Sequence, residues 1–229
     1  MLRAILKRAA AIDMTADGSP PIATRLKLAV FRNRLRTQGR RNKLQMASVR
    51  AHRQLSINIQ GDGNELCLNG ELRDSSINIQ GSNNRIRIDA TACLTWTDIS
   101  ILANDSEITI AAGTTILGKP NQPNVLLARG EPSRLNIGRE CMFSYGIEVR
   151  TSDSHPIFDA QGTHINPSSD IAIGDRVWVG TRCMILKGSQ LGQGAILAAA
   201  SVLTREISAR AIAAGIPAKV IRENVQWKR

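Results

Sequence analysis

The chain has 229 residues, enough for one sizeable hydrophobic core and a small appendage. Although 42% of its residues are hydrophobic, only 3% are aromatic, which favours a narrow interior of aliphatic side chains over a core built around rings. No run of about 18 apolar residues occurs, so the sequence excludes a conventional membrane-spanning helix.

The net charge of +11 is concentrated at the N-terminal end. Residues 1–53 contain thirteen Lys or Arg and two acids, whereas residues 54–229 contain seventeen of each. A neutral body with a basic arm predicts that the arm has its own anionic partner, a membrane surface or nucleic acid. Nucleic acid is disfavoured, because Phe31 is the arm's one aromatic residue for base stacking. Lys7 and Arg8 break the first apolar stretch, which argues against a secretory signal peptide.

Two helices are expected in this arm. A short basic helix over residues 1–12 would end at the Pro-containing stretch 17–21, and a second helix is expected over residues 22–37. The basic linker 38–53 would follow. The second helix would either lie in a bilayer interface or cap the open end of the next domain. The first alternative predicts a cytoplasmic protein at the inner face of the membrane.

The next stretch repeats itself about every twenty residues. The hexamer SINIQG occupies residues 56–61 and recurs at 76–81, and Leu66 and Leu68 are matched by Ile86 and Ile88 at the same offset. A looser third copy follows between residues 99 and 110. Such repetition predicts stacked solenoid coils with alternate aliphatic side chains pointing inward.

A six-residue period dominates the C-terminal half. Its aliphatic positions are Ile173, Val179, Ile185, Leu191, Leu197 and Leu203. Small residues precede most of them by two positions, as Cys183, Ser189 and Ala195 do. Neither the helical period of 3.6 nor the strand period of 2 explains this spacing, and strands in a sandwich would keep no single integer period. The pattern predicts a parallel β-helix, an all-β solenoid.

The periodicity divides the chain. We expect an arm and linker over residues 1–53, a β-helix over 54–204 and a closing segment over 205–229. Residues 151–170 are polar, contain two prolines and abandon the period, which predicts an inserted loop that carries function. The four cysteines form no CxxC pair, and Cys141 and Cys183 fall at small inward positions, so we expect buried thiols in a reducing compartment.

Three segments jointly resemble the hexapeptide-repeat acyltransferases, whose fold is a left-handed parallel β-helix. They are residues 152–157 (SDSHPI), 173–180 (IGDRVWVG) and 214–222 (AGIPAKVIR). The sequence around His155 is most similar to that of polysaccharide and sugar O-acetyltransferases. The left-handedness comes from this resemblance alone, because crossover connections are otherwise right-handed.

The resemblance implies a catalytic base. An alcohol is a weak nucleophile until its proton is removed, and His is suited to that task near neutral pH. Of the three histidines, at 52, 155 and 164, His155 matches the catalytic position of the family. Asp153 would orient His155 or bind a sugar hydroxyl, or else simply form a turn. His164 is expected to be structural or solvent-facing.

The resemblance also implies acetyl-CoA as co-substrate, with no metal. Trp178 would pack beside the acetyl and pantetheine arm, with packing between subunits as the alternative. The other residues implied for the donor are Gly180, Thr181, Ala199 and Thr204 along the pantetheine channel, and Arg205, Lys219 and Arg222 facing the nucleotide phosphates. The family's usual assembly implies a homotrimer with this site between neighbouring solenoids.

We therefore predict an acetyl-CoA-dependent O-acetyltransferase that acts on a polysaccharide or a sugar precursor. Three alternatives are an acetyltransferase for a small non-glycan acceptor, a carbonic anhydrase on the same solenoid, and a non-catalytic β-helix that binds its partner through the arm. The carbonic anhydrase would need three imidazoles around Zn²⁺, and His52 lies in the predicted arm.

Overall fold

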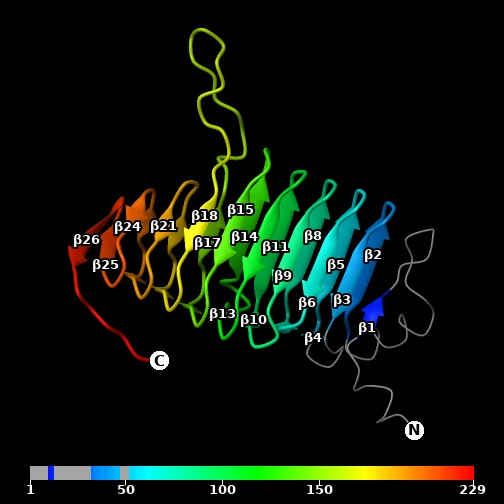
Figure 1. The fold of residues 1–229 in the computed structure, drawn as a ribbon, viewed down its shortest axis with the longest axis horizontal. Coiled ribbons are helices and arrows are strands. Elements are labelled where there is room, and N and C mark those ends of the chain that lie inside the picture. Colours follow the sequence, from blue (N-terminus) through cyan, green and yellow to red (C-terminus); the bar gives the residue numbers. More distant parts are fainter. Residues whose placement is uncertain (1–9, 13–31, 47–51) are drawn as a thin grey trace.

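The computed structural model describes residues 10–12, 32–46 and 52–229, and across these ranges the chain forms strands without a helix. The strands wind into an elongated prism, with the first described coils at one end and the last coils at the other (Figure 1). Within the described ranges, no helix is long and apolar enough to cross a membrane.

Three sheets form the sides of the prism. Sheet A contains, in spatial order, β1 (Ala10–Ile12), β3 (Lys43–Met46), β6 (Glu65–Leu68), β9 (Arg85–Ile88), β12 (Glu107–Ile110), β15 (Arg134–Ile137), β18 (Ile171–Ile173), β21 (Gln190–Leu191) and β24 (Glu206–Ile207). Sheet B contains β2 (Arg34–Gln38), β5 (Ser56–Gln60), β8 (Ser76–Gln80), β11 (Thr97–Leu102), β14 (Asn124–Arg129), β17 (Glu148–Arg150), β20 (Met184–Ile185) and β23 (Val202–Leu203). Sheet C contains β4 (His52–Arg53), β7 (Glu71–Arg73), β10 (Cys93–Thr95), β13 (Thr115–Leu117), β16 (Met142–Phe143), β19 (Trp178–Val179), β22 (Ile196–Leu197), β25 (Ile212–Gly215) and β26 (Ala218–Arg222).

Each coil runs from sheet B to sheet A to sheet C, and each strand pairs in parallel with its counterpart in the next coil. The three turns of a coil define the B–A, A–C and C–B corners of the prism. The two SINIQ strands, β5 and β8, pair with Ser56 opposite Ser76 and Ile59 opposite Ile79. The predicted all-β solenoid, a left-handed parallel β-helix, is confirmed.

The interior is a column of aliphatic side chains. The six aliphatic residues of the six-residue period are all buried: Ile173, Val179, Ile185, Leu191, Leu197 and Leu203. The small residues two positions before three of them, Cys183, Ser189 and Ala195, are buried as well. Burying one aliphatic side chain contributes about 1.5–3 kcal/mol. Cys141 and Cys183 are buried as predicted, and burial raises the pKa of the Cys141 thiol to about 11.

The start of the solenoid differs from the prediction. The predicted second helix ended at residue 37, but Arg34–Gln38 is a strand paired with β5, and Lys43–Met46 pairs with β6. These strands follow the outward and inward alternation of the next coils, so sheet pairing outweighs the local helical pattern. Part of the predicted linker is thus the first coil.

The prediction of a first helix over residues 1–12 is also wrong at residues 10–12, the part that the structure describes. Ala10–Ile12 forms β1, which pairs antiparallel with β3 at the edge of sheet A. The rest of the predicted arm lies outside the described residues. Its helices and its contact with a membrane stay predictions.

The solenoid also continues beyond the predicted boundary at residue 204. β24 extends sheet A and β25 extends sheet C, although the B–A corner there is only two residues long and interrupts the six-residue period. β26 turns back and pairs antiparallel with β25, which ends sheet C. The segment 223–229 then runs back along the prism (Figure 1).

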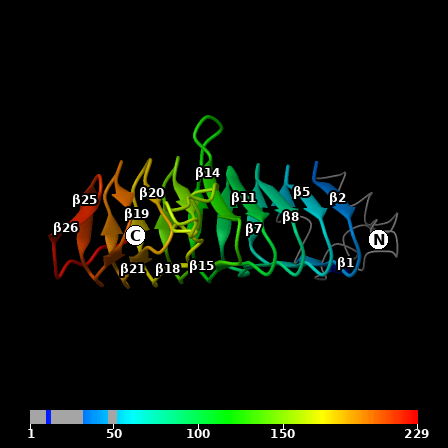
Figure 2. The ribbon, with the colours of Figure 1, turned by 90° about the horizontal axis from the view of Figure 1, so that it is seen from above.

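Residues 151–170 connect β17 to β18 and form the predicted inserted loop, which projects from the B–A corner (Figure 1). A shorter loop near residues 118–123 leaves the prism from the C–B corner, as the view from above shows (Figure 2). The loop at 151–170 is the larger departure from the solenoid and places polar side chains beyond its wall.

Candidate active site

The inserted loop is organised around Asn166. Its Nδ2 donates to the main-chain carbonyl of His155 and to Oδ2 of Asp153, both at 3.0 Å. Its Oδ1 accepts from the amide of Ile157 at 2.5 Å. The side chain of Asn166 thereby joins the first half of the loop to its second half and holds the backbone on both sides of residue 155.

Lys187 fastens this loop to the solenoid. It lies at the B–A corner of the next coil and donates to the main-chain carbonyls of Asn166 and Pro167 at 2.8 and 3.1 Å. Its ammonium group also lies 2.6 Å from Oδ2 of Asp153. Hydrogen bonds from Lys187 and then Asn166 lower the pKa of the Asp153 carboxyl, so it is ionised at neutral pH.

His155 itself is exposed on this framework. The residue before it, Ser154, has a positive φ of 70°, and its amide donates to Oγ of Ser152 at 3.1 Å. A side chain at this turn is therefore presented to solvent from a backbone that is held locally. An exposed imidazole on a fixed main chain has the access that a base needs to a large substrate.

The carboxylate of Asp153 lies at the base of the loop. Both described partners of its carboxylate belong to Asn166 and Lys187, and neither is the His155 ring. Asp153 is linked to the main chain of His155 through Asn166, whose Nδ2 donates to both groups. These contacts agree with the turn-forming alternative, and the roles of Asp153 in orienting the base or binding a sugar hydroxyl stay predictions.

His164 is structural, as one alternative predicted. Its Nδ1 lies 3.2 Å from Oε1 of Glu131 and its Nε2 lies 3.0 Å from Oδ1 of Asn166. Its ring also lies 5.5 Å from the ring of Phe158, centroid to centroid. These contacts hold the returning strand of the loop against the β14–β15 connection.

Trp178 lies on a different side of the prism. It is the outward residue of β19 on sheet C, paired with Met142 and Ile196, and 38% of its surface is exposed. Trp227 of the C-terminal segment packs beside it, with ring centroids 6.1 Å apart and planes inclined by 51°. Trp178 thus presents an aromatic surface on the outside of a coil.

Three of the predicted donor residues gather beside Trp178 at the C–B corner. The amide of Gly180 donates to the carbonyl of Leu197 and the amide of Ala200 donates to that of Thr181, both at 2.8 Å. The two coils are so close here that a β-carbon at Gly180 would lie 2.6 Å from the amide nitrogen of Ala199. Gly180, Thr181 and Ala199 therefore present mainly backbone to a ligand.

The other predicted donor residues lie elsewhere. Thr204 and Arg205 form the short B–A corner between β23 and β24, on the same edge as the inserted loop. Lys219 and Arg222 are exposed on β26, at the end of sheet C.

The topology separates the two halves of the candidate site. The B–A corner, with His155, Thr204 and Arg205, lies across the triangular prism from sheet C, which carries Trp178. Since a filled core lies between them, one chain does not bring His155 and Trp178 together.

Sequence analysis missed Asn166, Lys187 and Glu131. Asn166 and Lys187 are 21 residues apart, and the large loop between β17 and β18 hides that they meet at one corner. The order of strands in each coil offered one signal. Lys187 comes directly after β20 and the inserted loop comes directly after β17, and both strands belong to sheet B, so both segments occupy the B–A corner.

The three histidines do not form a metal site. His52 is buried in the first coil, whereas His155 and His164 lie on the projecting loop. Among the residues that the structure describes, no group of three His, Cys, Asp or Glu side chains is arranged to hold a metal ion.

No protein-family model matches the chain. Among solved structures, the chain is similar to the polysialic acid specific acetyltransferase NeuO, with a TM-score of 0.76 and 29% identity over 86% of this chain and 89% of that one. This likeness confirms the predicted resemblance to the acyltransferases built on a left-handed β-helix of hexapeptide repeats.

Within that class, the similar curated proteins are polysialic acid O-acetyltransferases. The chain is 36% identical to that of Escherichia coli O1:K1 over 42% of this chain and 31% of the relative. It is 30% identical to that of Neisseria meningitidis over 56% of this chain and 58% of the relative. The matches thus span less than two thirds of the length of either curated relative.

Proposed function

We propose that the chain is an acetyl-CoA-dependent O-acetyltransferase whose acceptor is a hydroxyl of a polysaccharide. The observation that carries the proposal is the exposed His155 on a loop that Asn166 and Lys187 fasten to the solenoid. The named activity of the E. coli and N. meningitidis relatives supports it.

In this reaction, His155 accepts the proton of the acceptor hydroxyl as the oxygen attacks the thioester carbonyl of acetyl-CoA. The new C–O bond forms, the C–S bond breaks, and CoA leaves as the thiolate, which takes up a proton. Transfer is direct, without an acyl-enzyme intermediate. The backbone groups at Gly180 and Thr181 and the indole of Trp178 would line the pantetheine arm.

The donor site is completed between copies of the chain, and we propose a homotrimer. His155, Thr204 and Arg205 come from the B–A corner of one copy, and Trp178 comes from sheet C of its neighbour. The separation of these residues across the prism of one chain supports this arrangement. A groove between two prisms would also admit a long glycan, which an enclosed pocket would not.

The test is the release of free CoA from acetyl-CoA in the presence and absence of polysialic acid. We expect turnover only with the glycan, and a loss of about 10²–10⁴-fold in kcat for His155→Ala. CoA binding, measured by calorimetry, should be retained. Full turnover by His155→Ala would contradict the assignment of the base.

The matched control is His164→Gln, which removes the other imidazole of the loop. Because His164 contacts Glu131 and Asn166, we expect a far smaller change in kcat than for His155→Ala. Equal losses in the two variants would mean that the loop, rather than a base at residue 155, is what turnover requires.

A further inference from the structure

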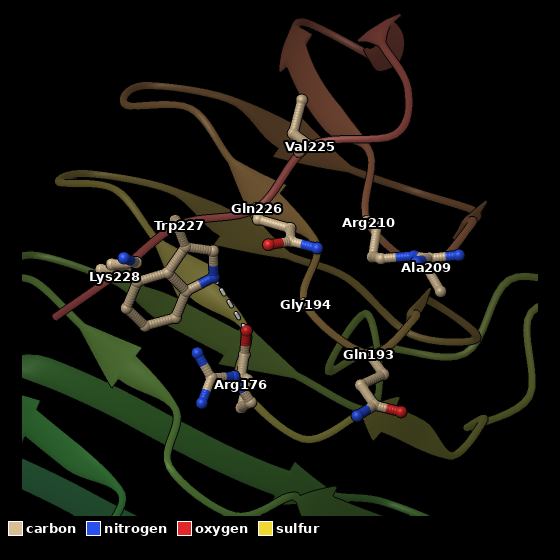
Figure 3. Close-up of a pocket in the computed structure, with 9 residues that line it drawn as sticks. All are labelled: Arg176, Gln193, Gly194, Ala209, Arg210, Val225, Gln226, Trp227 and Lys228. Atoms are coloured by element: carbon tan, nitrogen blue, oxygen red, sulfur yellow. Dashed lines mark hydrogen bonds between the residues drawn. The ribbon is translucent and has the colours of Figure 1, made fainter.

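A cavity of about 510 Å³ lies at the A–C corner, away from the inserted loop. Turns of three successive coils form its floor, and the C-terminal segment crosses over it (Figure 3). The lining residues are Arg176, Gln193, Gly194, Ala209, Arg210, Val225, Gln226, Trp227 and Lys228.

The hollow exists because one rung of the corner has no side chain. Arg176, Gly194 and Arg210 occupy equivalent turn positions in successive coils, with φ values of 55°, 69° and 54°. Coils in such a ladder stack about 4.8 Å apart, so two arginine rungs about 10 Å apart flank an empty glycine rung. A β-carbon at Gly194 would lie 3.4 Å from Cγ of Arg210.

The cavity is cationic. Arg176, Arg210 and Lys228 line it, and no carboxylate is found among its described lining residues. Arg176 lies 3.2 Å from Oε2 of Glu140 and is partly neutralised. Arg210 and Lys228 form no ion pair with any residue that the structure describes, so their charges are available to a ligand.

The crossing segment is fixed before any ligand arrives. The amide of Val225 donates to the carbonyl of Arg210, and the indole N–H of Trp227 donates to that of Arg176, both at 2.9 Å. Arg229 donates to the carbonyls of Gly113 and Cys141, at 3.2 and 3.0 Å. The roof of the cavity is thus built into the fold.

We propose that this cavity binds an oxyanion carried on a sugar, either a carboxylate or a phosphate. The guanidinium of Arg210 offers paired donors that match such a group. Lys228 lies beyond Trp227 in Figure 3 and adds positive charge to the roof. The amides of Gln193 and Gln226 supply donors and acceptors for ring hydroxyls (Figure 3). The volume suits one or two sugar rings rather than an isolated ion.

Two sources can present this chemistry, and their assignment rests on the proposed function. One is an acidic unit of the acceptor glycan, and the other is the phosphorylated ribose of the nucleotide half of the donor. The cavity differs from the donor positions named above, since Thr204 and Arg205 lie at the B–A corner and Lys219 and Arg222 on β26.

The experiment measures binding by calorimetry, without turnover. The probes are a trimer of N-acetylneuraminic acid, 3′,5′-ADP, and neutral maltotriose as the uncharged control. Arg210→Gln and Lys228→Gln are compared with Arg41→Gln, which removes the same charge from an exposed residue of similar φ at the far end of the prism. We expect one anionic probe to bind, and each cavity variant to weaken it at least about tenfold.

The probe that responds identifies the source. The inference is overturned if neither anionic probe binds, if Arg41→Gln weakens binding as much as the cavity variants do, or if maltotriose binds equally well. Acetyl transfer is measured separately on the same proteins. Oxyanion binding without transfer would contradict the proposed function alone, whereas transfer without oxyanion binding would contradict this inference alone.

Discussion

At the residue scale, function depends on side chains that the fold holds at a distance from their sequence neighbours. Asp153 and His155 are two residues apart, yet Asp153 supports His155 through Asn166, thirteen residues after Asp153. The carboxylate, the amide and the Lys187 ammonium form one network at the base of the loop. Such a network restrains the base of the loop.

His52 makes the stability of the first coil depend on pH. It is fully buried on the inner side of β4, and burial lowers its pKa from 6.5 to about 4. Between these values the unfolded chain binds a proton that the folded chain does not, so the free energy of unfolding falls as the pH falls. The loss amounts to about 3 kcal/mol between pH 6.5 and 4.

Replacing His52 by Leu should remove this dependence. In urea unfolding, His52 is expected to lower the free energy of unfolding of the wild type by about 2 kcal/mol between pH 6.5 and 5. The variant should lack this contribution. The two proteins are compared at each pH, so titration of all other groups cancels. Parallel pH profiles for the two proteins would contradict the assignment.

At the element scale, the C-terminal segment 223–229 acts as a strap. It crosses from the coil that contains Arg210 to the coils that contain Gly113 and Cys141. Because no strand pairing holds it, its attachment depends on the hydrogen bond from the Val225 amide to the Arg210 carbonyl and on a few side-chain contacts, chiefly those of Trp227 and Arg229. This strap brings the second indole to Trp178.

Trp227→Ala should therefore release the strap while leaving the solenoid folded. The variant loses the hydrogen bond to Arg176 and the ring contact with Trp178, together about 1–3 kcal/mol. We expect amide hydrogen exchange at Val225, whose N–H donates to the Arg210 carbonyl, to become about 10–100-fold faster, with β19 and β22 still protected. Gln226→Ala, in the same segment, should leave exchange almost unchanged, and equal acceleration by both variants would argue against the strap.

At the scale of the whole molecule, the prism decides which residues can share a site. Each coil presents one turn at each corner, so residues from one corner align along the axis while residues from another corner stay on a different side. The B–A corner collects His155, Thr204 and Arg205. Sheet C collects Trp178 with Lys219 and Arg222 near its end. The proposed site therefore requires a second copy of the chain.

Mixing two inactive variants tests that arrangement. His155→Ala and Trp178→Ala are each expected to lose acetyl transfer, yet trimers that contain both should regain it. In a random mixture about a quarter of the sites combine an intact His155 from one copy with an intact Trp178 from its neighbour. Recovery near that level in co-expressed protein supports the shared site, and no recovery from well-formed mixed trimers would place both residues in one chain.

The sequence by itself determined the solenoid. Its six-residue period and the SINIQG repeat specify which side chains point inward, because equivalent residues of successive coils pair side by side in the same sheet. The repeat also identified residues 151–170 as an insertion, because a polar stretch without period cannot fill the interior.

Only the tertiary structure decided what closes the ends and what surrounds the loop. Pairing with β5 made residues 34–38 a strand although their local pattern favours a helix. The contacts of Lys187 with Asp153, of Glu131 with His164 and of Trp227 with Trp178 join residues from different coils. Which residues meet in such contacts depends on the number of residues in each corner. Because the loops differ in length, sequence spacing alone does not show which residues lie side by side.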